Sequence, residues 1–61
     1  MPIVQVELLE GRTVAQKRLL AEKVTQAIVD AIGAPAESVT IIIRDMPKEN
    51  YSKAGKLAYD K

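Results

Sequence analysis

Residues 13–33 carry the signals of one long helix in a chain of only 61 residues. Thr13 and Gln16 form a capping-box pattern, in which the Thr13 side chain is the N-cap and Gln16 reaches back from the third helical position. Apolar residues then recur at spacings of three and four, which predicts one apolar stripe. The stripe consists of Leu20, Val24, Ala27, Ile28 and Ala31. Gly33 is a typical residue just beyond a helix end, so we expect the helix to end at about Ile32.

Short segments of strand-forming residues lie on both sides of this helix. Residues 3–9 approximate an alternation in which Val4, Val6 and Leu8 form an all-apolar face. Residues 38–44 are rich in β-branched side chains and almost continuously apolar, which predicts a strand covered on both faces. A strand, a long helix and a second strand make a βαβ unit, so we expect parallel strands with a right-handed crossover.

The remaining residues, from 47 to 61, are mostly polar, and residues 51–55 suggest a short hairpin. Two strands under one helix leave open edges and little core. Below about 70–80 residues a single core rarely supplies more than about 3–5 kcal/mol. This chain has neither Cys nor His, which excludes disulfides and the common zinc sites, yet 48% of its residues are hydrophobic. We therefore expect a homo-oligomer in which strand edges pair with other copies of the chain.

Charge and hydropathy argue against several classes of partner. Nine Lys and Arg stand against eight Asp and Glu, a net charge of +1 without the basic stripe of a nucleic-acid-binding protein. No apolar run approaches the length of about 18 residues that a membrane span requires. The N-terminus has neither the basic start nor the length of a signal peptide. We therefore expect a cytoplasmic protein that binds neither nucleic acid nor membrane.

Pro2 is a candidate catalytic residue because it follows the initiator methionine. Once Met1 is removed, the Pro2 ring nitrogen becomes a terminal secondary amine, and an α-amino group has a pKa of about 7.7–8.0. That pKa is close to the ideal for a general base at neutral pH. While Met1 remains attached, the nitrogen belongs to a tertiary amide and cannot act as a base. The alternative is that Pro2 merely begins an edge strand, where proline is tolerated.

Arg12 is a candidate anion-binding residue. It precedes the N-cap Thr13 at the helix end that carries about half a positive charge, where an exposed cation is disfavoured by about 0.3–1 kcal/mol. Free backbone amides together with a guanidinium suit a carboxylate, which arginine can bind with two hydrogen bonds. The alternative is a solvated turn arginine paired with Glu10. Arg44, at the end of the second predicted strand, has the same two alternatives. For Tyr51 the alternative is hydrophobic filler without a role in binding.

Short segments spread over the whole chain form a recognisable pattern. They are Pro2-Ile3-Val4-Gln5-Val6, Leu9-Glu10-Gly11-Arg12-Thr13, Gln16-Lys17, Ala34-Pro35, Ser38-Val39, Met46-Pro47-Lys48, Tyr51 and Ala54-Gly55-Lys56. In these segments the sequence resembles the 4-oxalocrotonate tautomerase family, also called 2-hydroxymuconate tautomerases. No single segment is decisive, but an N-terminal proline with Leu-Glu-Gly-Arg at the correct offset is a specific combination. Residues 1–61 are accordingly expected to form a single tautomerase-like domain.

The resemblance implies an α/β (α+β) fold of the tautomerase/MIF-like type, a single β-α-β unit with a short C-terminal hairpin that assembles through intersubunit sheets. Dimers would form four-stranded sheets, and three dimers would form a hexamer. It also implies a cofactor-independent isomerase that uses no metal and acts in the degradation of aromatic compounds. Pro2 would take a proton from the 2-hydroxyl of a small carboxylate-bearing dienol, such as 2-hydroxymuconate, and return one at carbon 5.

The resemblance also assigns roles to the substrate-binding residues. Arg12 matches the arginine that binds the carboxylate end of the substrate in a neighbouring subunit. Tyr51 matches an aromatic residue, usually phenylalanine, that walls the apolar part of the pocket and helps to keep the pKa of the proline low. Leu9 and Ser38 match less critical lining positions.

Thr40 departs from the family pattern. The best-studied members carry a second arginine there, which polarises the 2-oxo and carboxylate oxygens of the substrate. Losing a preorganised charged donor costs about 3–4 kcal/mol of transition-state stabilisation. Arg44 lies on the same strand face, about 13 Å away along the strand, so partial compensation by Arg44 is a hypothesis. The departure leaves a rival function open, a βαβ oligomerisation or binding module with weak or no catalytic activity.

Overall fold

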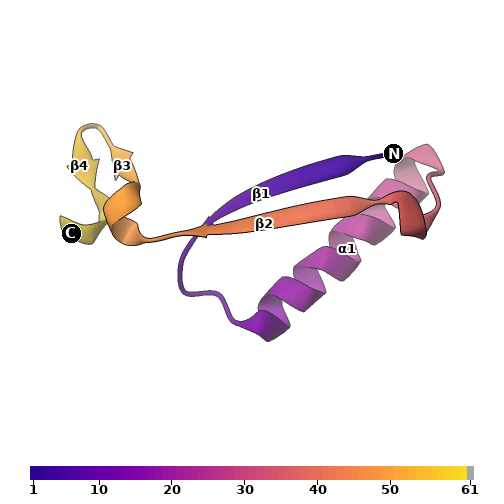
Figure 1. Ribbon diagram of the computed structural model, residues 1–61, viewed down its shortest axis with the longest axis horizontal. Helices are drawn as coiled ribbons and strands as arrows, with labels where there is room; N and C mark the ends of the chain where they lie inside the picture. The colour runs from indigo at the N-terminus through magenta and orange to yellow at the C-terminus, as the bar shows by residue number, and fades with distance from the viewer. Residues whose placement is uncertain (61) are drawn as a thin grey trace.

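The structure is a computed structural model that describes residues 1–60. The chain folds into two main strands, one long helix and a small C-terminal hairpin (Figure 1). Two short 3₁₀ turns lie between these elements, and a third follows the hairpin. In order, the elements are β1 (Ile3–Leu9), α1 (Val14–Ile32), η1 (Ala36–Ser38), β2 (Thr40–Met46), η2 (Lys48–Asn50), β3 (Ser52–Lys53), β4 (Lys56–Leu57) and η3 (Ala58–Asp60). This is the predicted β-α-β unit followed by a hairpin.

Strands β1 and β2 pair in parallel, with a register that runs from Ile3 opposite Thr40 to Leu9 opposite Met46. The predicted bounds of the second strand were wrong by two residues at each end. Ser38, predicted to begin the strand, instead ends a 3₁₀ turn over residues 36–38, in which its amide and its hydroxyl donate to the Pro35 carbonyl at 3.0 and 2.9 Å. Ser38 therefore lies in the turn that leads into β2 and not in the strand itself.

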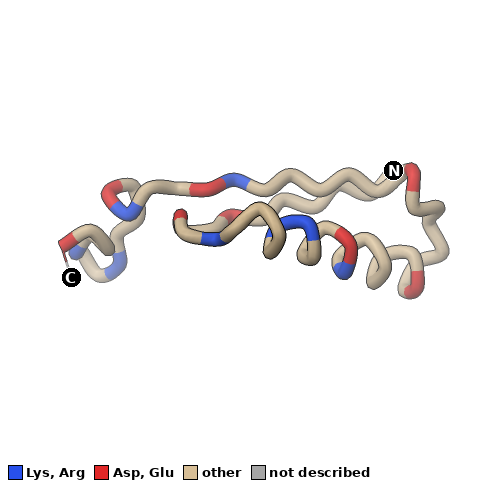
Figure 2. Tube along the Cα trace, turned by 90° about the horizontal axis from the view of Figure 1, so that it is seen from below, with Lys and Arg blue, Asp and Glu red and all other residues tan. Residues whose placement is uncertain are grey.

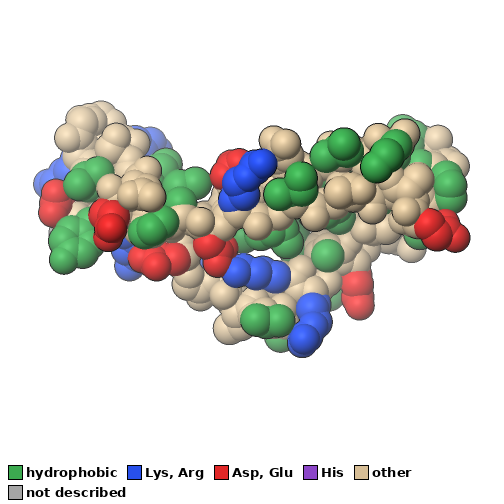
Figure 3. Space-filling view, viewed as in Figure 1, with side chains coloured by type: hydrophobic (Ala, Val, Ile, Leu, Met, Phe, Trp, Pro, Cys, Tyr) green, Lys and Arg blue, Asp and Glu red, His purple; other side chains and the backbone are tan. Residues whose placement is uncertain are grey.

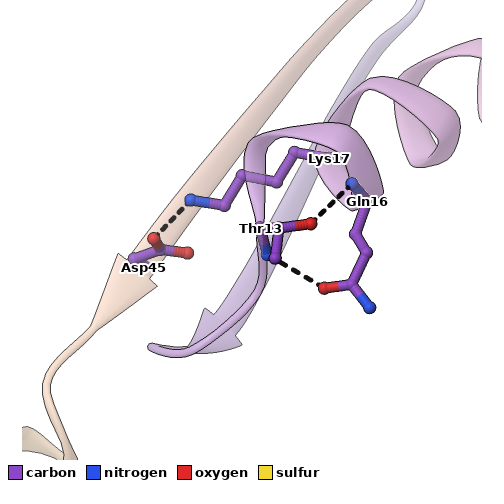
Figure 4. Close-up of polar contacts among 4 residues, drawn as sticks. All are labelled: Thr13, Gln16, Lys17 and Asp45. Atoms are coloured by element: carbon purple, nitrogen blue, oxygen red, sulfur yellow. Dashed lines mark hydrogen bonds and ion pairs between the residues drawn. The ribbon is translucent and has the colours of Figure 1, made fainter.

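Helix α1 begins and ends where the sequence predicts. The Thr13 hydroxyl accepts a hydrogen bond from the Gln16 amide at 3.1 Å, and the Thr13 amide donates to the Gln16 side-chain oxygen at 2.9 Å (Figure 4). At the other end, Gly33 adopts a left-handed conformation with φ of 73°, and its amide donates to the Val29 carbonyl at 3.0 Å. That conformation favours glycine, which explains why the helix stops there.

The face of α1 that packs on the sheet differs in part from the predicted stripe. Leu20, Val24 and Ile28 are half-buried as expected, but Ala27 and Ala31 are exposed. The half-buried positions also include Lys17, Ala21, Thr25 and Val29. At 3.6 residues per turn, Ala27 projects about 60° to one side of Val24, whereas the additional half-buried residues continue the stripe on the other side.

The sheet has one face under the helix and one open face. The helix-facing side of β1 carries Val4, Val6 and Leu8, which are half-buried, while Ile3 on the opposite face is 58% exposed. Figure 3 shows hydrophobic side chains at the surface along much of the length of the strands. Within residues 1–60, no side chain reaches full burial. The single chain therefore leaves much of its apolar surface uncovered, which supports the expectation that copies of it associate.

The C-terminal hairpin lies beyond the ends of both the helix and the two long strands (Figure 2). Strands β3 and β4 pair antiparallel, with Ser52 opposite Leu57 and Lys53 opposite Lys56. The turn residues Ala54 and Gly55 have φ values of 54° and 81°. Two successive positive φ values are typical of the turn that connects tightly paired antiparallel strands. The predicted hairpin is thus present and extends to Leu57.

Candidate active site

Pro2 stands immediately before β1 and is half-buried. Its carbonyl accepts a hydrogen bond from the Thr40 amide at 2.9 Å, which fixes the start of β2 beside it. Ser38 lies two residues before Thr40, so three of the predicted site residues gather at this end of the sheet. Met1, which precedes Pro2, is 88% exposed and therefore accessible to removal.

Arg12 and Tyr51 belong to the opposite end of the sheet. Arg12 lies in the loop after β1, and Tyr51 follows η2, beyond the carboxyl end of β2. Because β1 has seven residues, these groups and Pro2 are separated by the length of a strand, about 20 Å. A single chain consequently does not bring Pro2, Arg12 and Tyr51 together, and in Figure 1 the N-terminus and the hairpin lie at opposite ends of the molecule.

Arg12 is exposed and forms no ion pair with any other residue in the described part of the chain. The alternative pairing with Glu10 is not observed, since the Glu10 carboxylate accepts a hydrogen bond from the Lys48 amide at 3.2 Å instead. Arg12 borders a hollow of about 260 Å³. The hollow is lined by Leu8, Arg12, Gln16, Lys17 and Leu20. Its wall therefore combines aliphatic side chains with two cations.

Lys17 in this hollow is paired with an acidic residue of the sheet. Its ammonium lies 2.5 Å from a carboxylate oxygen of Asp45 at the end of β2 (Figure 4). The contact joins residues 28 positions apart, so no local sequence pattern predicts it. Neither residue is predicted as a site residue from the sequence, where Lys17 belongs only to a segment that carries the family resemblance.

Arg44 is engaged elsewhere on the sheet. Its guanidinium donates to the Glu7 carboxylate at 2.9 Å, and Glu7 is its register partner on β1. Both side chains are about half exposed, at 49% and 52%. Arg44 lies four residues along β2 from Thr40, and this chain does not bring it to the Pro2 end. Compensation for Thr40 by Arg44 stays a prediction.

Tyr51 and Leu9 occupy the hairpin side of the site. The Tyr51 carbonyl accepts a hydrogen bond from the Ala58 amide at 2.9 Å, which ties the start of the hairpin to its return. The Tyr51 side chain is 39% exposed. Leu9 is half-buried at the end of β1, opposite Met46. Both residues therefore lie at the same end of the sheet as Arg12.

Residues 1–60 contain no group of three or more His, Cys, Asp or Glu side chains placed to hold a metal ion. The one long helix is neither apolar enough nor uncharged enough to cross a membrane, and the other described helical segments are short turns.

Comparison with known proteins places this fold and these residues in a family. Residues 2–61 match the family model described as tautomerase enzyme. The chain is 51% identical over 55 residues to a 2-hydroxymuconate tautomerase from Comamonas testosteroni, covering 90% of this chain and 87% of that protein. It is 49% identical over 61 residues, the full length of both chains, to a probable tautomerase from Bacillus cereus.

Solved structures agree. The crystal structure of YwhB, a homologue of 4-oxalocrotonate tautomerase, superposes with a TM-score of 0.94 at 47% identity and 98% coverage of both chains. A heterohexamer 4-oxalocrotonate tautomerase from Chloroflexus aurantiacus has a TM-score of 0.91 at 28% identity and covers 98% of this chain and 97% of that one. The chain therefore belongs to the tautomerase family. Tautomerases are isomerases, so the predicted fold and enzyme class are confirmed.

Proposed function

We propose that this chain is a cofactor-independent tautomerase that converts 2-hydroxy-dienoates, such as 2-hydroxymuconate, into their conjugated 2-oxo isomers. Such acids arise when the rings of aromatic compounds are cleaved. The name of the Comamonas testosteroni relative supports this substrate class, and the position of Pro2 supports the chemistry. In the chain that has lost Met1, Pro2 would present a secondary amine at the end of the sheet, beside Thr40.

The proposed reaction moves one proton through the Pro2 amine. The free amine takes the proton of the 2-hydroxyl, the O–H electrons form the 2-oxo group, and the diene electrons shift toward carbon 5. The resulting ammonium then gives a proton to carbon 5, which restores the free amine. The rate depends on the fraction of Pro2 that is unprotonated, because only the free base can accept the proton.

Arg12 is proposed to bind the far carboxylate of a substrate that reacts at Pro2 of another subunit. The observation that carries this assignment is the separation of the two residues, by about the length of a seven-residue strand within one chain. An active site with both groups therefore requires a second copy. A homo-oligomer, as a trimer of dimers, would meet this need and cover the open face of the sheet.

Tyr51, Leu9 and Ser38 complete the proposed pocket as lining residues. Tyr51 offers an aromatic ring, and Leu9 an aliphatic side chain, to the apolar middle of a dienoate. Ser38 stands next to the Pro2 end, although its hydroxyl is already donated to the Pro35 carbonyl. We therefore assign Ser38 a lining role and no proton transfer.

Thr40 favours a second candidate function, that of a βαβ oligomerisation or binding module with little catalysis. A threonine hydroxyl supplies one hydrogen bond and no positive charge where a substrate would develop negative charge on its oxygens. A single comparison of the processed parent with its Pro2→Ala variant distinguishes the two candidate functions. Tautomerisation of 2-hydroxymuconate that is fast in the parent and lost in Pro2→Ala supports the enzyme. Equal rates for the two proteins would leave the binding module as the better account.

A further inference from the structure

The loop that carries Arg12 is attached to the carboxyl end of β2 at both of its ends. On the β1 side, the Glu10 amide donates to the Met46 carbonyl at 2.9 Å and the Glu10 carboxylate accepts from the Lys48 amide at 3.2 Å. On the helix side, Lys17 in the first turn of α1 pairs with Asp45. Two acidic side chains therefore fix the strand end and the helix start relative to one another.

Only a few residues separate these two attachments. Gly11 has φ of 120°, a conformation that L side chains rarely adopt, although a Cβ there would meet no atom within 4 Å. Thr13 is held by both hydrogen bonds of the capping box. Arg12 is thus the one residue between Gly11 and the N-cap, and its backbone position follows from the attachments on either side.

The Lys17–Asp45 pair also sets the charge of the hollow that Arg12 borders. Lys17 lines the same hollow, and its side chain is 29% exposed against 38% for Asp45. The nearby carboxylate neutralises the Lys17 charge. Of the two cations in the hollow wall, Arg12 alone has no ion pair within residues 1–60.

We propose that Lys17 and Asp45 are positioning residues for Arg12. Their ion pair holds the first turn of α1 against β2, so that the Arg12 guanidinium is presented in one place to the far carboxylate of the substrate. This inference rests on the proposed function of Arg12 and extends it to two residues that act by holding the Arg12 loop in place. A surface ion pair has little effect on stability, so its main consequence should lie in the geometry of the loop.

The test uses a variant that removes the pair without changing the net charge, Lys17→Met combined with Asp45→Asn. Steady-state kinetics compare the dicarboxylate 2-hydroxymuconate with 2-hydroxypenta-2,4-dienoate, which lacks the far carboxylate. For the dicarboxylate we expect KM to rise about tenfold with kcat nearly unchanged, because only binding of the far end is weakened. For the monocarboxylate we expect both parameters to stay within about twofold of the parent.

Two further variants distinguish positioning from a general structural role. In an Arg12→Ala background the double substitution should raise KM no further, since residues that act through one another are not additive. Lys17→Arg, which keeps the pair, should behave like the parent. The proposal would be overturned if the double substitution reduced activity equally on both substrates and did so in the Arg12→Ala background as well. An unchanged KM for the dicarboxylate in the double variant would also overturn it. If the double variant fails to fold, Asp45→Asn alone is compared by the same criteria.

A binding measurement keeps this inference separate from the proposed function. Calorimetry with muconate, a dicarboxylate without the 2-hydroxyl, reports affinity whether or not the protein is catalytic. A parent that shows no Pro2-dependent turnover contradicts the proposed function only. If Arg12→Ala weakens the affinity for muconate and the double variant weakens it about tenfold, the positioning role is still supported. If either Arg12→Ala or the double variant leaves this affinity unchanged, the positioning role is overturned.

Discussion

The Pro2 carbonyl accepts a hydrogen bond of 2.9 Å from the Thr40 amide, so the proposed base and the residue that departs from the family pattern lie next to each other. The register places Thr40 opposite Ile3, one residue after Pro2. The two backbones therefore lie side by side where β2 begins. We expect that a long side chain at position 40 reaches a substrate bound at the Pro2 nitrogen.

Replacing Thr40 by Arg should raise kcat/KM for 2-hydroxymuconate by about 10²-fold. The guanidinium would supply the positive charge that the 2-oxo and carboxylate oxygens of the substrate require, and one preorganised donor contributes about 10²–10³ in rate. Stopped-flow absorbance measures the change. Thr40→Gln, which is long and polar but uncharged, is the control and should gain far less. No gain with Thr40→Arg would show that position 40 does not reach the substrate.

Activity should be restored when two inactive variants are mixed. Pro2→Ala lacks the base and Arg12→Ala lacks the anion-binding group, but an oligomer that contains both can assemble a site with one intact copy of each. We expect each variant alone to lose at least about 10²-fold in kcat/KM. After joint refolding at equal amounts, activity should recover to a substantial fraction of the parent. Mixtures that stay inactive although mixed oligomers form would place both residues in one subunit.

A charge on the open face of the sheet should break the assembly. Ile42 lies on that face, opposite Gln5, and Ile42→Glu would bury an unpaired carboxylate in any interface there. Light scattering should show the parent as an oligomer and the variant as smaller species. Lys23→Glu, on the exposed side of α1, is the control and should leave the parent mass unchanged. A mass of 6.7 kDa for the parent by light scattering, which is the mass of one chain, would contradict the predicted oligomer.

Substitution of Ala54 should stabilise the protein. Ala54 has φ of 54°, and an L residue in this region costs about 1–2 kcal/mol. Asn before Gly is the preferred pair for this turn, so Ala54→Asn should raise the free energy of unfolding by about 0.5–1 kcal/mol. Thermal unfolding at fixed protein concentration measures the change. Gly55→Ala, which places a side chain at φ of 81°, should shift the melting temperature in the opposite direction.

The sequence predicts those parts of the fold that depend on near neighbours. The capping box at Thr13 and the helix end at Gly33 follow from residue types a few positions apart, and the structure confirms both. The start of β2 does not follow in this way. Ser38 stands next to a run of β-branched residues and is predicted as strand, but its amide and hydroxyl both donate to the Pro35 carbonyl, which makes Ser38 the last residue of a 3₁₀ turn.

In the candidate site, residue type and position in the sequence predicted individual residues. They did not predict which residues contact one another across the fold. Pro2 and Arg12 stand out because one follows the initiator methionine and the other precedes an N-cap. The pairing of Lys17 with Asp45 joins positions 28 residues apart, and the pairing of Arg44 with Glu7 joins positions 37 apart. The first contact depends on how α1 packs against β2, and the second depends on the register of β1 against β2. A single sequence specifies neither.

Removal of Met1 offers the most direct test of the account, because the Pro2 nitrogen is an amide in the unprocessed chain and an amine in the processed one. Intact mass spectrometry gives the fraction of chains that lack Met1, and the same preparations are assayed with 2-hydroxymuconate. Tautomerase activity should rise in proportion to that fraction and approach zero when every chain retains Met1. Full activity in protein that retains Met1 throughout would contradict Pro2 as the base.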